Sequence, residues 1–302
     1  MRHDSAILPM RADRPSWRQL LSLPMIVFLV GCAALAIPTM IGVAQVSWST
    51  EQGGHGPLVM ATGAWLLWRE LKQSPAAIAP GNLLFGGLAL AICLAVFILA
   101  RITGTLEVEA FAMYGSIISG AYLLFGGALL RSIWFPLIYL AFALPPPETV
   151  VAAITQPIKI AISEGAVWLL HAVGYPIASS GVTIQIAQYE LLVAAACAGL
   201  NSIVTLSALC LLYSYLRHRS DPIPFIVICI AAIPVAMFAN FIRVLVLILL
   251  TYHFGEATAQ GFLHDAAGLM MFSVALMTVF AIDQSFTPLV RRAWNGIRGG
   301  RA

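Results

Sequence analysis

The sequence predicts an all-α integral membrane protein with about eight transmembrane helices. Of its 302 residues, 60% are hydrophobic and only 10% are charged, and the mean hydropathy is +0.91. A soluble domain carries about 25% charged residues, so this chain has too few charges to cover a water-facing surface. The apolar residues also gather in runs of about 20, the length that crosses a bilayer as a helix.

The predicted spans lie near residues 20–44, 57–71, 81–101, 108–130, 132–146, 197–216, 224–250 and 265–284. The second and fifth runs are short, so their full crossing is open. The first run follows four arginines, as in a signal peptide. It is longer than the apolar region of about 7–15 residues found in signal peptides, and we therefore expect a retained transmembrane helix.

Residues 147–196 differ from the spans on either side. The segment follows Pro145-Pro146-Pro147, contains Lys159 and Glu164, and alternates apolar and polar residues after Gly181. This pattern predicts an amphipathic helix on the membrane surface at about 148–173 and an extended or hairpin element at about 175–190.

Basic residues in short loops indicate the orientation, because such residues concentrate on the cytoplasmic side. With a cytoplasmic N-terminus, the eight-span model places 13 of the 16 Lys and Arg residues inside. They are Arg2, Arg11, Arg14, Arg18, Arg69, Lys72, Arg131, Arg217, Arg219, Arg291, Arg292, Arg298 and Arg301. We therefore expect a cytoplasmic basic N-terminus (1–19), a polytopic membrane domain (20–285) with segment 147–196 on its outer face, and a cytoplasmic basic C-terminal tail (286–302).

Arg243 lies well inside the span 224–250, with Asn240 three residues earlier on the same helix face. An arginine near the middle of a membrane helix costs about 2.5–3.5 kcal/mol even on the insertion scale, so such a residue indicates a functional site. The span is longer than the bilayer core requires, which allows Arg243 to lie just below the outer surface. A structural arginine that extends to the membrane surface or pairs with Glu190 or Asp265 is the alternative.

The same topology places two more polar groups at the depth of Arg243, just below the outer membrane surface. Cys197 begins the sixth span at its outer end, with Asn201 on its face, and His264 begins the eighth. Each residue alone has a structural explanation. Together Cys197, His264 and Arg243 could serve as a nucleophile, a base and an electrophilic stabiliser. Burial in lipid raises the pKa of a thiol, and a nearby Arg or protonated His lowers it, so a reactive cysteine here needs such neighbours.

Other kinds of site are less well supported. The odd number of cysteines, five, shows no CxxC spacing, and the chain has no HExxH motif, zinc spacing, phosphate-binding glycine loop or GxSxG elbow. We expect no cofactor and no metal. The net charge of +3 also argues against a nucleic-acid partner. Asp265 and Glu190 remain candidates for an orienting partner and a counter-ion.

The chain resembles the exosortase/archaeosortase family, polytopic membrane cysteine transpeptidases of prokaryotes. The resemblance rests on Cys197-Ala-Gly-Leu-Asn-Ser, Asn240-Phe-Ile-Arg243 and His264-Asp-Ala-Ala-Gly268, in that order. It extends to the first outer loop with His55-Gly56 and to residues 174–182, and it covers about residues 20 to 285. Ala198 and Gly54 stand where family members commonly have serine, which leaves the subfamily open.

The resemblance implies a protease or transpeptidase that cleaves PEP-CTERM-like C-terminal sorting tails of secreted proteins at the outer face of the inner membrane. Such a tail combines a short Pro-containing motif, an apolar helix and a basic end. Cys197 would be the nucleophile, Arg243 the transition-state stabiliser and His264 the acid/base, and the acceptor nucleophile is unknown. The expected partners are these secreted proteins and membrane lipid.

Two other functions fit the residues alone. A polytopic transporter or a component of polysaccharide or lipid export could bind an anionic substrate through Arg243 and His264, with Cys197 inert. A membrane acyltransferase could use His264 without Cys197. Only the transpeptidase requires the thiol.

Overall fold

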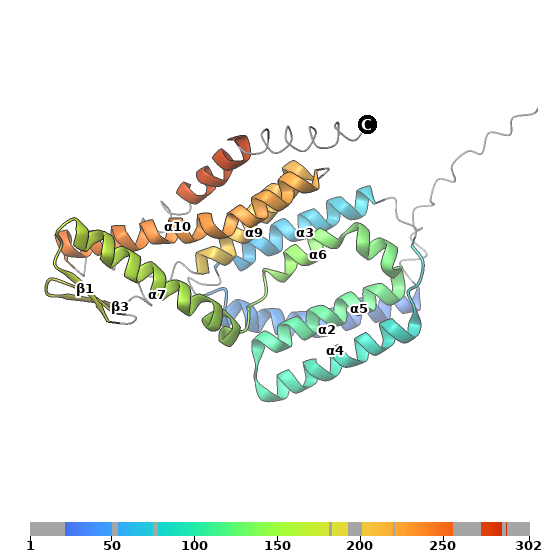
Figure 1. The fold of residues 1–302 in the computed structure, drawn as a ribbon. Helices are drawn as coiled ribbons and strands as arrows, with labels where there is room; N and C mark the ends of the chain where they lie inside the picture. Colours follow the sequence, from blue (N-terminus) through green and yellow to red (C-terminus); the bar gives the residue numbers. More distant parts are fainter. Residues whose placement is uncertain are drawn as a thin grey trace, which may run out of the picture. The chain divides into compact units, whose positions relative to one another are not determined.

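The computed structural model describes residues 22–49, 54–74, 78–180, 183–192, 201–219, 221–255, 273–285 and 288. The chain divides into two compact units. The N-terminal unit comprises residues 1–49 and 56–145, and the C-terminal unit comprises residues 50–55 and 146–302. Each unit is described separately below, with the helices and strands labelled as in Figure 1.

Five helices make up the described part of the N-terminal unit. They are α2 (Leu23–Val46), α3 (Gly56–Gln73), α4 (Leu83–Thr103), α5 (Leu106–Ser132) and α6 (Trp134–Ala141). Helix α5 packs against both α2 and α4, and α3 packs against α6. The buried carboxylate of Glu109 on α5 accepts hydrogen bonds from Thr39 on α2 and Arg101 on α4, each 2.7 Å long. This acidic group therefore links three helices of the unit.

Local sequence explains where these helices begin, end and bend. The side chain of Asn82 accepts a hydrogen bond from the Phe85 amide at 3.0 Å, which caps α4. Gly104 ends α4 in the left-handed conformation, with φ 71°. Helix α5 is kinked at Gly126, where φ is 77°. A side chain at this position would collide with the carbonyl oxygen of Ala79, so the kink requires glycine.

The C-terminal unit contains helices and one small sheet. Its elements are α7 (Glu148–Ala172), β1 (Ile177–Ser180), β2 (Thr183–Ile186), β3 (Tyr189–Leu192), α9 (Asn201–His218), α10 (Pro222–Phe254) and a helix over Ser273–Ser285. The strands form an antiparallel sheet in the order β1-β2-β3. Ile177 pairs with Ile186 across the first two strands, and Gln185 pairs with Glu190 across the last two.

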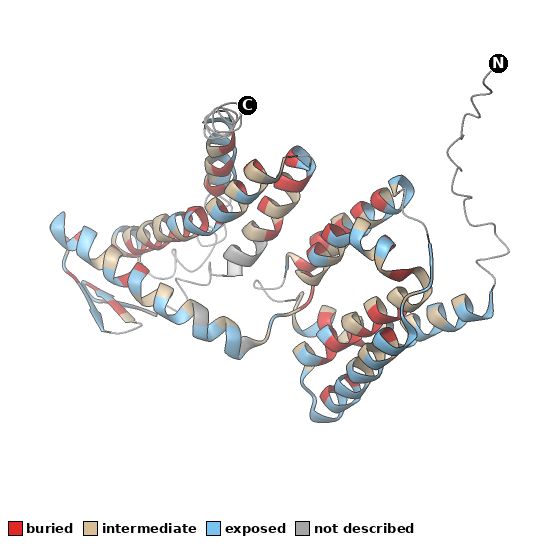
Figure 2. Cartoon of the chain, turned by 45° about the vertical axis from the view of Figure 1, so that its right-hand side comes forward, coloured by how far each residue is buried: buried red, intermediate tan, exposed pale blue. Residues whose placement is uncertain are grey.

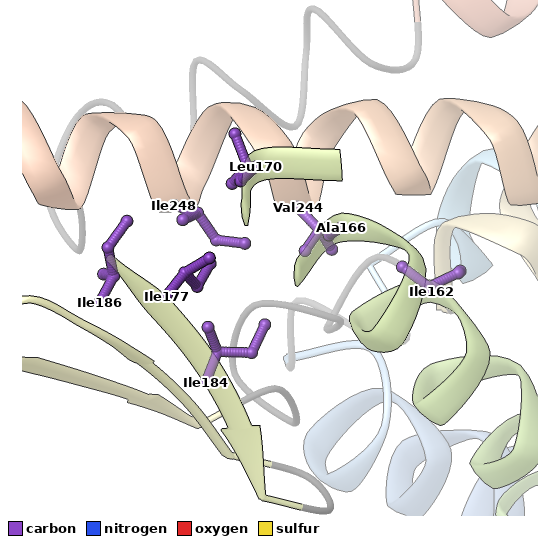
Figure 3. Close-up of a cluster of buried hydrophobic side chains, with 8 residues drawn as sticks. All are labelled: Ile162, Ala166, Leu170, Ile177, Ile184, Ile186, Val244 and Ile248. Carbon is purple, nitrogen blue, oxygen red and sulfur yellow. The ribbon is translucent and has the colours of Figure 1, made fainter. Parts of the chain in front are cut away.

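One apolar core joins the sheet to two helices of this unit. Its buried members come from α7, from β1 and β2, and from the second half of α10, namely Ile162, Ala166, Leu170, Ile177, Ile184, Ile186, Val244 and Ile248. Figure 3 shows the isoleucines of the strands beneath Val244 and Ile248 of α10. The second half of α10 therefore packs against protein.

Large apolar side chains remain exposed on many helices. Figure 2 shows exposed and buried residues on the same helices, and Leu83 and Leu84 of α4 are 80% and 82% exposed. Contiguous apolar surface of this kind is typical of protein that faces lipid. Within the described residues, α2, α4, α5, α7 and α10 are long and apolar enough to cross a membrane.

The prediction of a mostly helical membrane protein is confirmed, but three details differ. The predicted all-α protein allowed for an extended or hairpin element at about 175–190, and β3 adds a third strand, so that the element is a small sheet. Helix α6 has only eight residues, about 12 Å at 1.5 Å per residue, so it cannot itself cross the 30 Å core that the span 132–146 implied. The segment predicted as a surface helix, α7, has the length and composition of a span. The count of about eight spans is therefore not confirmed.

Candidate active site

Helix α10 carries the polar residues at the centre of the candidate site. It runs for 33 residues, begins with Pro222 in its first turn and ends at Phe254, before Gly255, whose φ is 84°. At 1.5 Å per residue the helix is about 50 Å long. It is longer at both ends than the predicted span 224–250.

The buried face of α10 changes character along its length. In the first half, Val235 and Ala239 belong to an apolar cluster with Cys210 of α9 and with Val279. In the second half, Val244 belongs to the core with α7 and the sheet. The polar residues Asn240 and Arg243 lie between these two apolar clusters.

Asn240 and Arg243 occupy one turn of this buried face. Asn240 is 0% exposed and Arg243 is 7% exposed. Their separation of three residues places them on the same side of the helix, about 4.5 Å apart along its axis. The sequence predicted this shared face, and the structure adds that both side chains are buried.

The amide of Asn240 differs from the other polar groups of the unit. Neither its nitrogen nor its oxygen has a hydrogen-bond partner among the residues that the structure describes. A buried polar group left unpaired costs about 1–3 kcal/mol of stability. The fold therefore maintains at this position a group that it does not use for its own hydrogen bonding.

The other residues of the predicted site lie near the ends of described elements or beyond them. Cys197, His264 and Asp265 lie outside the described residues. Asn201 is the first residue of α9, four positions after Cys197 in the chain. Glu190 is exposed on β3. The catalytic grouping of Cys197, Arg243 and His264 stays a prediction.

Trp48 and Gly56, which lie close to His55 in the chain, are in contact with each other. Trp48 donates a hydrogen bond from its indole nitrogen to the carbonyl oxygen of Ala143 at 3.0 Å. A side chain at position 56 would collide with the Trp48 ring, which explains the glycine in His55-Gly56. His55 itself is half-buried and groups with the C-terminal unit.

Sequence reasoning missed a second buried polar group in the C-terminal unit, which we call the Asp283 cluster. The Asp283 carboxylate accepts hydrogen bonds from the Tyr213 hydroxyl at 2.6 Å and from His218 Nε2 at 2.7 Å. Arg217 Nε lies 2.8 Å from the same carboxylate. The sequence indicates only that Tyr213 and Arg217, four residues apart, share a face of α9; their pairing with Asp283 has no local signal.

The remaining cysteines offer matched positions for testing the thiol. Cys32, Cys93, Cys210 and Cys229 are free thiols. Cys210 is 1% exposed, whereas the other three are half-buried. Across the described ranges, no three or more His, Cys, Asp or Glu side chains are grouped as metal ligands.

Comparison with known protein families gives a match over most of the chain. A family model of transmembrane exosortases matches residues 48–281, which is more than three quarters of the 302 residues. The match includes Asn240 and Arg243 and extends across the positions of Cys197 and His264. No curated protein and no solved structure matches the chain.

Proposed function

The chain belongs to the transmembrane exosortase family, and we propose that it is a membrane-embedded cysteine transpeptidase that cleaves C-terminal sorting tails of secreted proteins. The observation that carries this proposal is the buried pair Asn240 and Arg243 on α10, within the region matched by the family model. An arginine that is kept buried at such cost needs a function, and stabilising a developing negative charge is one that suits it.

The proposed reaction has two acyl-transfer steps. The Cys197 thiol loses its proton to His264, and the sulfur attacks the carbonyl carbon of the scissile peptide bond. The resulting oxyanion is stabilised by Arg243. The C–N bond then breaks, His264 returns the proton to the leaving amine, and a thioester remains on Cys197.

The second step releases the enzyme. An acceptor nucleophile, or water, attacks the thioester carbonyl and gives its proton to His264. The C–S bond breaks and the proton passes to the Cys197 sulfur, which restores the thiol. Transfer to an amine would join the secreted protein to a surface component, and transfer to water would release it.

The small sheet supports a site at a membrane surface. An open sheet leaves unpaired N–H and C=O groups along its edges, and these groups find no partners in hydrocarbon. The sheet packs against Val244 and Ile248, so this level of α10 belongs outside the hydrocarbon core. Arg243 directly precedes that level, which suits a reaction on a peptide that emerges from the bilayer.

We propose the outer face of the inner membrane, with both termini in the cytoplasm. The distribution of Lys and Arg among the predicted loops favours this orientation. The chain must then cross once between α5 and the sheet. Helix α7, with or without the short α6, provides enough apolar length for this crossing. A crossing by α7 leaves the sheet and Arg243 on the outer side.

The proposal is tested by replacing the nucleophile. Because the reaction passes through a thioester, Cys197→Ala should abolish processing of a reporter protein with a C-terminal Pro-Glu-Pro motif, an apolar helix and a basic end. Cys229→Ala is the matched control, since Cys229 is half-buried in α10 and should be dispensable. Processing is followed by the change in reporter mass in cells with equal enzyme levels.

Two outcomes would contradict parts of this proposal. Processing by Cys197→Ala above a few per cent of the wild-type rate would exclude the thioester and favour a reaction in which His264 acts without Cys197. Labelling of Cys197 by a membrane-impermeant thiol reagent only after the cytoplasmic side is opened would overturn the orientation.

A further inference from the structure

The unpaired amide of Asn240 provides a starting point beyond the catalytic residues. Asn240 is 0% exposed, and within the described part of the chain both its Nδ2 and its Oδ1 are without a hydrogen-bond partner. Buried polar groups in folded proteins are nearly always paired. An unpaired amide next to a buried arginine therefore points to a ligand that completes its hydrogen bonds.

Other buried polar side chains of the same helices are paired within the protein. Thr251 of α10 donates to the Leu247 carbonyl oxygen at 2.9 Å. Ser214 of α9 donates to the Phe225 carbonyl oxygen at 3.2 Å. The unpaired state is therefore particular to Asn240 among these three residues.

The chemistry of the amide restricts the class of ligand. An anion would use only the NH₂ group of Asn240, and a cation would use only its oxygen. A ligand that satisfies both must present an acceptor and a donor side by side. In an extended peptide, the N–H and C=O of one residue point the same way and pair with a neighbour through two hydrogen bonds. An asparagine side chain is complementary to this arrangement.

The position of the amide restricts where on the peptide it binds. Asn240 lies one helical turn from Arg243 on the same face, and Arg243 faces the oxyanion in the proposed reaction. We propose that Asn240 binds the main-chain N–H and C=O of a residue adjoining the scissile bond of the sorting tail. This inference rests on the proposed function. It adds hydrogen bonds to the substrate main chain that do not depend on the side chains of the tail.

The first test separates a binding residue from a structural one. Leucine has the same branching and number of heavy atoms as asparagine but no polar atoms, so Asn240→Leu removes an unpaired group from the core. We expect the melting temperature of the purified protein in detergent to stay the same or rise. The KM for the Pro-Glu-Pro tail reporter should rise about tenfold or more, as expected for lost hydrogen bonds.

The control is Thr251→Val, which removes a paired buried hydroxyl from the same helix. This variant should process the reporter normally. A lower melting temperature for Asn240→Leu would show that the amide has a structural partner, and a normal KM would show that it binds no substrate. Either result overturns the inference.

The second test identifies the partner atoms on the substrate. Synthetic tail peptides carry an ester in place of each amide bond around the cleavage site in turn, which removes one N–H at a time. One ester should raise the KM of the wild-type enzyme about tenfold and leave the KM of Asn240→Leu unchanged. Equal losses in both enzymes at every position would exclude contact between Asn240 and the peptide backbone.

Failure of this inference can be told apart from failure of the proposed function. If Cys197→Ala is inactive while Asn240→Leu has normal kinetics, the transpeptidase stands and the role of Asn240 is wrong. If Cys197→Ala remains active, the proposed function is wrong, and the role of Asn240 in this reaction falls with it.

Discussion

Two buried polar groups of the C-terminal unit differ in how completely their hydrogen bonds are made. The Asp283 carboxylate is held by Tyr213, Arg217 and His218 at 2.6–2.8 Å. Among the buried side-chain atoms of this cluster, within the described residues, Nδ1 of His218 has no partner. In the middle of α10, by contrast, both polar atoms of Asn240 are unpaired within the described residues.

This contrast suggests that the Asp283 cluster and Asn240 have different roles within the C-terminal unit. The Asp283 cluster connects α9 to the helix Ser273–Ser285, so its paired charges serve the fold. The amide of Asn240 makes no hydrogen bond within the described residues, and in our proposal it binds the substrate backbone. Predictions about stability therefore concern Asp283, and predictions about turnover concern the Asn240–Arg243 pair.

Removing the carboxylate of the Asp283 cluster should have the largest effect on stability. Asp283→Ala leaves His218 and Arg217 without their partner, and His218 is 6% exposed. We expect a loss of about 3 kcal/mol in the free energy of unfolding, measured by denaturant titration in detergent. Turnover of the folded fraction should stay within about twofold. A tenfold loss of turnover at unchanged stability would contradict the assignment of the Asp283 cluster to stability and of the Asn240–Arg243 pair to turnover.

Changing the arginine should have the opposite signature. Arg243→Lys keeps a positive charge but loses the planar guanidinium, and one lost oxyanion donor lowers turnover about 10²–10³-fold. The melting temperature should change little. Single-turnover rates of reporter cleavage at matched enzyme levels provide the measurement, and alkylation of Cys197 shows that the site is still accessible. Near-normal turnover would reduce Arg243 to a charge or an anchor.

The smallest effect is expected at the edge of the Asp283 cluster. Tyr213→Phe removes one hydrogen bond, while Arg217 and His218 still hold the carboxylate. We expect a loss of about 1–2 kcal/mol in the free energy of unfolding and normal processing. A loss as large as that of Asp283→Ala would mean that the tyrosine hydroxyl, and not the charged partners, carries the stability of the cluster.

Sequence reasoning predicted most helices within a few residues of their ends, because the start and end of each apolar run can be identified directly in the sequence. The predicted span 132–146, whose full crossing was left open, contains the short helix α6 over Trp134–Ala141. Hydropathy records that a segment avoids water. It does not record whether the segment packs against protein, as α6 does against α3, or against lipid.

The shared face of Asn240 and Arg243 was determined by the sequence alone. A separation of three residues on a helix has one geometry, whatever the helix contacts. The match to the exosortase family likewise depends only on the order of residues. The shared face depends only on residues close together in the chain, and the family match depends only on the amino-acid sequence.

The partners of these residues were decided only by the tertiary structure. Asp283 meets Tyr213 and His218 across 70 and 65 positions of the chain, and no local pattern specifies such pairings. The same holds for the sheet, whose third strand depends on a register with β2, and for the core that it shares with α10. Whether a buried amide is paired depends on every element packed around it, so the unpaired state of Asn240 was visible only once α10 had been placed among its neighbours.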